Sequence, residues 1–256
     1  MTLYYAIIAV SVLLYVTFWY LYGQKVGRLD VADEAWGLAQ PFIVLVAILI
    51  AKNYSISSII LLILTLIWGY RLFSHLHSRH AKSPGEDMRY AEMRAEWKSL
   101  LRLKAYIYVF ILQGILMYLL GVASMILVHS NVPLNLFSLI GIVVWVFGFI
   151  FETIADRQLK YFIKDPVNKG KIMNQGLWKY SRHPNYFGEV TMWWGIFFFV
   201  LVNTGIFWAI ITPITITYLI VFVSGIPLTE KHFGGSPLWQ KYKDQTSPLI
   251  PWPSRK

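Results

Sequence analysis

Gly176-Leu-Trp-Lys-Tyr-Ser-Arg-His-Pro-Asn-Tyr-Phe-Gly-Glu189 runs directly into an apolar segment that ends near Asn203. Polar side chains continue into this segment as Asn185 and Glu189, which lie four residues apart and therefore share one face of a helix. A plain membrane anchor needs only apolar residues between flanking basic or aromatic ones. Ionisable groups at membrane depth are costly and mark functional sites. The segment therefore predicts the mouth of a ligand site at the start of a membrane span.

The composition of the whole chain places it in a membrane. Of its 256 residues 57% are hydrophobic, the mean hydropathy is +0.53, and the 14% that are charged cluster between long apolar runs. The chain has no Cys, which excludes disulfides, thiolate catalysis and Cys-ligated metals. We attribute the net charge of +10 to loops near anionic lipid and expect no nucleic-acid partner. The first apolar segment lacks the features of a cleaved signal peptide, so we expect it to be retained.

Seven apolar runs are long enough, or nearly so, to cross a hydrocarbon core, which needs about 20 helical residues. They are too long for strands and lack a period of two. We therefore predict an all-α integral membrane protein whose seven transmembrane helices form one bundle and a single domain over residues 1–256. The expected spans are Thr2–Tyr22, Ala35–Ala51, Ser55–Phe73, Ala105–His129, Leu134–Ala155, Tyr186–Asn203 and Thr204–Ser224.

The distribution of basic residues predicts the orientation of the bundle. Lys and Arg gather after the first span, in the loops 74–104 and 156–185 and in the tail 225–256, whereas the alternate connections are nearly uncharged. The positive-inside rule makes the basic side cytoplasmic, with the N-terminus outside and the C-terminus inside. Within the 74–104 loop we expect an amphipathic helix from Glu86.

Basic and aromatic residues lie close together before the sixth span. Such a set can hold phosphates by charge-assisted hydrogen bonds while the aromatic rings stack on a flat ring. The alternative is an ordinary interfacial belt of Trp, Tyr and Lys. The residues are Lys171, Trp178, Lys179, Tyr180, Arg182, His183 and Tyr186.

Two carboxylates end the fifth span. Glu152 and Asp156 lie four apart on one helix face, where they repel each other and need hydrogen-bond donors. A cofactor with hydroxyl and amide groups would supply these donors. A salt bridge to a neighbouring loop is the alternative.

A third polar group lies at the entry to the second span, where Asp33 and Glu34 follow Asp30. Burial would favour the protonated form of one of these acids, which could then donate a proton. The helix macrodipole alone would also favour carboxylates at this position. Tyr70, at the end of the third span, could join an acid in polarising a carbonyl oxygen, or it could be an interface anchor.

The remaining polar motifs predict no metal site and a folded tail. His75, His77 and His80 lack the accompanying carboxylate pattern of zinc enzymes, so we expect no metal. Glu230 and His232 follow the last span. The tail after them carries Pro, Trp and Tyr residues, and we expect it to fold back over the cytoplasmic mouth as a lid.

These motifs together resemble the steroid 5α-reductase-like family of membrane enzymes, in particular its bacterial branch of largely unassigned substrate. The resemblance runs from about Asp30 to the C-terminus and is most specific between Glu152 and Gly195. It is carried by Gly-Leu-Trp at 176–178, Asn-Tyr-Phe-Gly-Glu at 185–189, Trp-Trp-Gly at 193–195, Glu-Asp-Met-Arg-Tyr at 86–90 and the closing Pro-Leu-Ile-Pro-Trp-Pro.

The resemblance implies a multi-pass protein of a bacterial inner membrane that binds NADPH from the cytoplasm. Hydride would pass to the β carbon of a lipophilic enone held in the bilayer part of the bundle. In the family's pattern Asn185 and Glu189 would hold the nicotinamide end. The remaining cofactor residues would be Glu152, Asp156, Lys171, Arg182, His183, Tyr186, Trp193, Glu230 and His232.

The chain departs from the family at two places. The reductases usually have Asn at the position of Glu152, and a Gln-Glu pair where this chain has Asp33-Glu34. Glu34 and Tyr70 are the expected catalytic pair, with Trp68 as another candidate near the Tyr position. The departure makes a substrate other than a steroid plausible.

Two other functional classes remain open. Arg182-His-Pro-Asn-Tyr186 also resembles the run that precedes a helix in membrane methyltransferases of the isoprenylcysteine carboxyl type, which use S-adenosylmethionine. A transporter or lipid-binding protein would instead place paired polar groups at the bilayer midplane. The polar groups gather at one mouth, and Asn185 with Glu189 favours the reductase.

Overall fold

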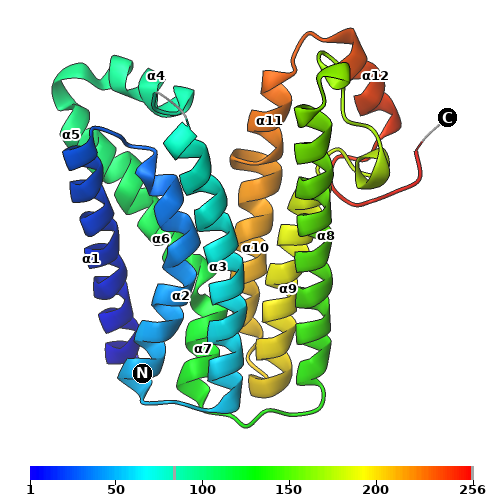
Figure 1. Ribbon diagram of the computed structural model, residues 1–256. Helices are drawn as coiled ribbons and strands as arrows, with labels where there is room; N and C mark the ends of the chain where they lie inside the picture. The colour runs from blue at the N-terminus through cyan, green and yellow to red at the C-terminus, as the bar shows by residue number, and fades with distance from the viewer. Residues whose placement is uncertain (83–84, 255–256) are drawn as a thin grey trace. The chain divides into compact units, whose positions relative to one another are not determined.

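The computed structural model describes residues 1–82 and 85–254, apart from the side chain of His232 (Figure 1). The described residues are mainly helical and contain no strand beyond one isolated parallel bridge between Ser181 and Ser247. Seven helices in this part of the chain are long and apolar enough to cross a membrane, which confirms the predicted number of spans and the helical class. They are Thr2–Val26, Val31–Ala51, Ile56–Lys82, Met88–Leu120, Ser138–Lys164, Pro184–Thr204 and Phe207–Lys231.

The helices continue beyond the apolar runs that predicted them. The second begins at Val31 instead of Ala35 and the third reaches Lys82 instead of Phe73, because hydropathy marks only the part that suits hydrocarbon. The fourth span is built from α4 (Met88–Trp97), η1 (Lys98–Leu100), α5 (Leu101–Lys104), η2 (Ala105–Ile111) and α6 (Leu112–Leu120). It ends at Gly121, and α7 (Val122–Ser130) follows. The amphipathic helix expected from Glu86 is α4, which Asp87 caps by accepting a hydrogen bond from the Arg89 amide.

Contacts between residues divide the chain into two compact units. The first comprises Met1–Leu134 with Asn203–Ile211, and the second comprises Asn135–Val202 with Thr212–Lys256. The orientation of the termini and the packing of all spans into one bundle stay predictions.

In the first unit α2 (Val31–Ala51) packs against α1 (Thr2–Val26), α3 (Ile56–Lys82) and α7. The backbones of α2 and α3 meet at Gly37 and Gly69. A methyl group added at Gly37 would lie 2.8 Å from the amide nitrogen of Phe73. Small residues at such crossings let membrane helices approach closely.

In the second unit α8 (Ser138–Lys164) and α9 (Pro184–Thr204) approach in the same way. A methyl group at Gly148 would lie 2.6 Å from the carbonyl oxygen of Gly188, and one at Gly188 would lie 2.6 Å from the amide nitrogen of Glu152. This contact fixes the polar end of α8 against the first turns of α9.

The rest of the second unit comes from shorter helices. They are η3 (Pro166–Asn168), η4 (Gly176–Lys179), α10 (Ile211–Tyr218), η6 (Leu219–Val223), α11 (Ile226–His232) and α12 (Pro237–Gln245), while η5 (Phe207–Ile210) belongs to the first unit. Both η2 and η6 are π-helical segments within longer helices.

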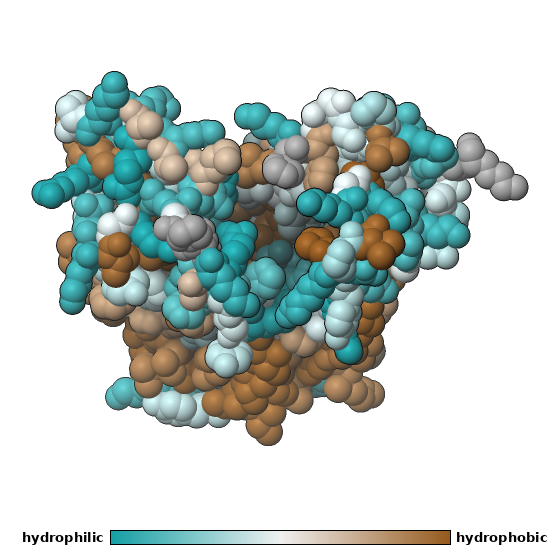
Figure 2. Space-filling view, turned by 45° about the horizontal axis from the view of Figure 1, so that its top comes forward, coloured by the Kyte–Doolittle hydropathy of each residue, from teal (hydrophilic) through white to brown (hydrophobic). Residues whose placement is uncertain are grey.

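The surface separates apolar from polar side chains. Figure 2 shows hydrophobic residues over the spans and hydrophilic residues gathered beyond them. Many large aliphatic and aromatic side chains on the spans are exposed, Leu14 and Phe18 on α1 and Val143 on α8 among them. Such surfaces suit contact with lipid.

Candidate functional site

The end of α8, the beginning of α9 and the helix α12 surround a cavity of about 420 Å³, which we call the aromatic cavity. All of its lining residues belong to the second unit. They are Leu159, Phe162, Ile163, Lys171, Ile172, Met173, Trp178, Arg182, His183, Asn185, Tyr186, Thr229, Phe233, Trp239 and Tyr242. A mostly apolar hollow with a few polar groups is the usual form of a small-molecule site.

Local hydrogen bonds place the start of α9 at this cavity. The Trp178 indole donates to the carbonyl oxygen of Ala155 on α8 at 3.0 Å. The Ser181 hydroxyl accepts the amide of His183 at 3.1 Å, and Pro184, which has no amide hydrogen to satisfy, begins the helix. The residues Arg182 to Tyr186 are therefore held on a rigid turn.

Oδ1 of Asn185 is buried and has no hydrogen-bond partner among the described residues. Nε2 of His183 is also buried, and Oε1 of Glu230 lies 3.5 Å from it. The His183 ring stacks on Tyr186 with centroids 5.3 Å apart and an interplanar angle of 14°. Buried polar groups in folded proteins are nearly always paired, so unpaired ones beside a cavity point to a ligand.

Arg182, which we expected to bind the cofactor, is bonded to other residues of the protein. Its side chain is 6% exposed, and it donates from Nε at 2.9 Å and from Nη2 at 2.7 Å to Oε1 of Glu230. Its Nη1 donates to the carbonyl oxygens of Lys243 and Thr246 at 3.0 and 2.6 Å. Lys243 pairs with the other Glu230 oxygen at 3.1 Å. Arg182 therefore joins the last span to the end of α12, which satisfies carbonyl groups that the helix leaves open.

The tail folds back as expected. The Arg182 amide donates to Ser247 at 2.8 Å, the Ser181 hydroxyl to Leu249 at 2.8 Å and the Trp252 amide to Tyr180 at 2.9 Å, each time to the carbonyl oxygen. The Tyr242 hydroxyl donates to the carbonyl oxygen of Trp178 at 2.5 Å. Side chains of α12 thereby form one wall of the aromatic cavity.

His183 gives the site a pH dependence. Burial lowers the pKa of its imidazole to about 4, and the Glu230 carboxylate, whose Oε1 lies 3.5 Å from Nε2, offsets only part of that effect. The folded protein holds His183 neutral, whereas the unfolded chain takes up a proton below pH of about 6.5. We expect stability to be maximal above that pH and to fall by up to about 3 kcal/mol as the pH drops toward 4.

Melting temperatures of detergent-purified wild type and His183→Gln between pH 7.5 and 4.5 test this expectation. The substitution removes the titrating group, so the melting temperature should fall less steeply with acidification in the variant. Equal slopes for the two proteins would show that His183 does not contribute.

The structure places the other expected cofactor residues at different depths. Lys171 lines the aromatic cavity and is exposed. Glu152 is buried on α8 beside Gly188, Asp156 lies one turn later and partly exposed, and Glu189 is also partly exposed. Trp193 is almost fully buried further along α9. The side chain of His232 lies outside the described part of the structure.

Glu34 and Tyr70, the expected catalytic pair, lie on α2 and α3 of the first unit and are not brought together. Glu34 is buried, with its Oε1 2.8 Å from Nδ1 of His80 and its Oε2 3.2 Å from Nδ1 of His77. Tyr70 is 70% exposed.

The carboxylate that contacts a tyrosine is Asp33. It accepts a hydrogen bond from the Tyr90 hydroxyl at 2.7 Å and one from Arg89 at 2.9 Å. Gln113 donates to the Tyr90 oxygen at 3.3 Å. The sequence indicated the 86–90 loop as a charged motif, but it did not indicate that Arg89 and Tyr90 of this loop contact Asp33.

A second cluster surrounds Asp30, which has no exposed surface. It accepts hydrogen bonds from Arg28 at 2.9 and 2.7 Å and from the Asp87 amide at 3.0 Å, and His80 Nε2 lies 3.7 Å away. Burial alone would raise the pKa of this carboxyl, but the hydrogen bonds outweigh burial and hold the pKa below its usual value. Within the described residues no group of three His, Cys, Asp or Glu side chains is arranged to hold a metal ion.

The sequence family described as "Protein of unknown function (DUF1295)" matches residues 19–246, which include both polar clusters and the aromatic cavity. The chain belongs to the DUF1295 family. This DUF1295 chain is also similar to an uncharacterized protein of Schizosaccharomyces pombe. The two are 25% identical over 247 residues, which cover 86% of this chain and 71% of the yeast protein. No solved structure matches the chain.

The aromatic cavity of this DUF1295 chain suits a particular class of ligand. Aromatic side chains on several of its walls favour a flat ring, and the amide of Asn185 and the imidazole of His183 offer hydrogen bonds to its edge. Lys171 supplies a positive charge. A nicotinamide or an adenine bearing a ribose fits this set of groups.

Proposed function

We propose that this protein is a membrane-embedded reductase that uses NADPH to reduce the carbon–carbon double bond of a lipophilic enone. The observation that carries the proposal is the buried, unpartnered Oδ1 of Asn185 beside an aromatic-lined cavity. The sequence resemblance to the steroid 5α-reductase-like family supports it, and the DUF1295 match covers the same residues.

The residues of the second unit would bind and orient the cofactor. Asn185 and Glu189 would hold the carboxamide of the nicotinamide, Tyr186 and the neighbouring aromatic rings would pack on its faces, and Lys171 would meet a phosphate. NADPH would supply the hydride, and the protein would contribute position and electrostatic fit. Glu34 and Tyr70 remain our candidates for polarising the substrate oxygen; Glu34 is bonded to His77 and His80, and Tyr70 is exposed.

Methyl transfer from S-adenosylmethionine is the second candidate, and one observation favours it. Two basic residues, Arg182 and Lys171, are among the described residues that line the aromatic cavity. Arg182 already donates to Glu230, Lys243 and Thr246, so Lys171 is the cation available to a ligand. One cation is few for the three phosphates of NADPH but sufficient for the carboxylate of S-adenosylmethionine.

Titrating the purified protein with NADPH, NADH and S-adenosylmethionine while following its melting temperature separates the two functions. A ligand that binds only the folded state raises the melting temperature by mass action. We expect a rise with NADPH, whereas a rise with S-adenosylmethionine alone would establish the methyltransferase. Oxidation of NADPH that depends on an added enone, measured for wild type, Glu34→Gln and Tyr70→Phe, then tests the catalytic pair.

Substitutions at the nicotinamide end should weaken NADPH binding without unfolding the protein. Asn185→Ala removes a side-chain amide that has an unpartnered oxygen, and Glu189→Gln removes a charge. Losing hydrogen bonds of this kind costs about 1–3 kcal/mol, so we expect dissociation constants to rise about 5- to 150-fold with unchanged melting temperatures of the free proteins. Unchanged affinity in both variants would remove the assignment of the nicotinamide end.

A further inference from the structure

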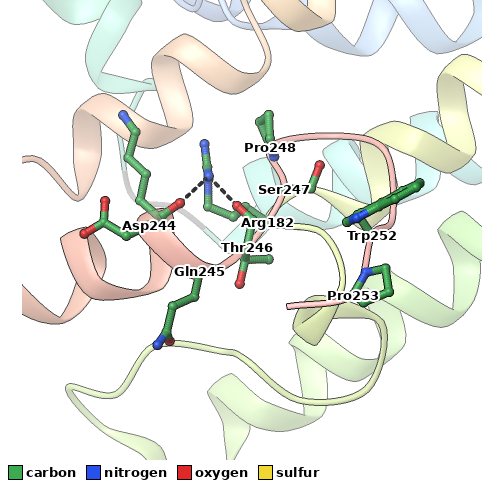
Figure 3. Close-up of a pocket in the computed structure, with 9 residues that line it drawn as sticks. Arg182, Asp244, Gln245, Thr246, Ser247, Pro248, Trp252 and Pro253 are labelled. Carbon is green, nitrogen blue, oxygen red and sulfur yellow. Dashed lines mark hydrogen bonds between the residues drawn. The ribbon is translucent and has the colours of Figure 1, made fainter. Parts of the chain in front are cut away.

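A second hollow lies beside the aromatic cavity in the same unit. It measures about 300 Å³, and we call it the tail cavity (Figure 3). Arg182 lines both cavities, so this residue stands in a wall that they share. The other lining residues come from the end of α12 and from the tail: Lys243, Asp244, Gln245, Thr246, Ser247, Pro248, Trp252 and Pro253.

Hydrogen bonds within the protein hold the walls of the tail cavity in place. Three hydrogen bonds hold the tail backbone at Ser247, Leu249 and Trp252 to the segment 180–182. Arg182 holds the carbonyl groups of Lys243 and Thr246 from the other side, as the dashed lines in Figure 3 show. Binding in such a hollow requires no prior ordering of the chain, which favours affinity.

Trp252 gives this cavity an uncovered aromatic surface. Its backbone amide is held by Tyr180 and its neighbours in the chain are Pro251 and Pro253, yet the residue is 66% exposed. The backbone of this tryptophan is fixed and its ring is exposed, so a nucleobase can stack on the ring.

Lys243 supplies the tail cavity with a cation, and Asp244 supplies it with a carboxylate. The Lys243 side chain is 45% exposed, whereas that of Arg182 is buried and already bonded to Glu230 and to two carbonyl groups. A phosphate that enters the cavity would therefore meet Lys243.

We propose that the tail cavity binds the adenosine end of NADPH, with the adenine on Trp252 and a phosphate at Lys243, while the aromatic cavity binds the nicotinamide end. The inference rests on the proposed reductase function and extends it to an elongated site of two parts. S-adenosylmethionine carries its adenine and its reactive methyl on one ribose and needs only one of the two cavities.

Equilibrium binding to the full-length protein in detergent tests the proposal with three probes: NADPH, reduced nicotinamide mononucleotide and 2′,5′-ADP. Trp252→Ala should weaken binding of NADPH and of 2′,5′-ADP by about 10- to 100-fold, because stacking on the base is lost. The same variant should bind reduced nicotinamide mononucleotide as the wild type does. Trp252→Phe keeps a flat ring and should bind NADPH within about threefold of the wild type.

Trp208→Ala is the matched control, because Trp208 is 74% exposed and belongs to the first unit. It should leave all three affinities unchanged. NADPH affinity that is the same in Trp252→Ala and wild type would overturn the inference while leaving the reductase function in place, and so would an equal loss for the mononucleotide. Wild-type protein that binds no NADPH would refute the reductase function itself, and the inference with it.

Discussion

Replacing Arg182 with alanine is expected to lower the free energy of unfolding by about 3–5 kcal/mol and to release the tail from the segment 178–182. The substitution leaves the Glu230 carboxylate, whose side chain is only 14% exposed, without its closest cation. It also removes the donor that satisfies the carbonyl groups of Lys243 and Thr246. Thermal denaturation in detergent measures the loss, and hydrogen exchange over residues 237–252 reports release of the tail.

Two further variants separate this effect from a general loss of charge. Lys243→Ala removes a cation from the same carboxylate, but the Lys243 side chain is 45% exposed, so we expect a cost within about 1 kcal/mol. Adding Glu230→Gln to Arg182→Ala removes the buried charge that the single variant leaves unpaired, and it should recover part of the stability. No recovery in the double variant would show that the two side chains are not energetically coupled.

The second large effect is expected at Asp30. Asp30→Asn keeps the shape of the side chain but removes its negative charge. That charge is fully buried, accepts two hydrogen bonds from Arg28 and lies near His80. Breaking a buried charge pair costs about 3–5 kcal/mol. The Asp87 amide also loses a charged acceptor, so we expect residues 85–94 to exchange hydrogen faster.

Asp244→Asn is the control for Asp30→Asn. Asp244 is an exposed carboxylate that accepts one hydrogen bond from Gln240 at 2.7 Å, so its substitution should change stability by less than about 0.5 kcal/mol. Wild-type protection of residues 85–94 in Asp30→Asn would contradict the view that Asp30 anchors the start of α4.

The sequence was sufficient to predict the parts of the fold that depend on composition. Seven helical spans follow from apolar length, and the helix from Met88 follows from the charged residues that begin at Glu86. The return of the tail was predictable because its Pro, Trp and Tyr residues would serve no purpose in a disordered end. The gathering of Arg182, His183, Asn185 and Tyr186 at one cavity was predictable because the four are neighbours in the chain.

Pairs between distant residues were not predictable. Glu34 meets His77 and His80, more than 40 residues away, and Asp33 meets Tyr90, 57 residues away. Helical periodicity says which residues share a face of one helix, but it does not say which residue of another helix lies opposite. The choice of Tyr70 as the partner of Glu34 relied on the family's pattern, and in this structure the nearest partners of Glu34 are imidazoles.

The bonding of Arg182 to Glu230, in place of the expected phosphate, has the same explanation. A basic residue at the mouth of a span is as suitable for a protein carboxylate as for a phosphate, since both accept two parallel hydrogen bonds. Which of the two it meets depends on Glu230, 48 residues later in the chain.

The π-helical segment η2 sets the rotational phase of everything that follows it in the fourth span. A π-helical segment accommodates an extra residue, and one residue of an α-helix corresponds to a turn of about 100°. Gln113, which donates to Tyr90, and Gly114, where a methyl group would lie 3.2 Å from Val16, come directly after it. Deleting a single residue between 105 and 111 would therefore swing both away from their partners while leaving the length and hydrophobicity of the helix almost unchanged.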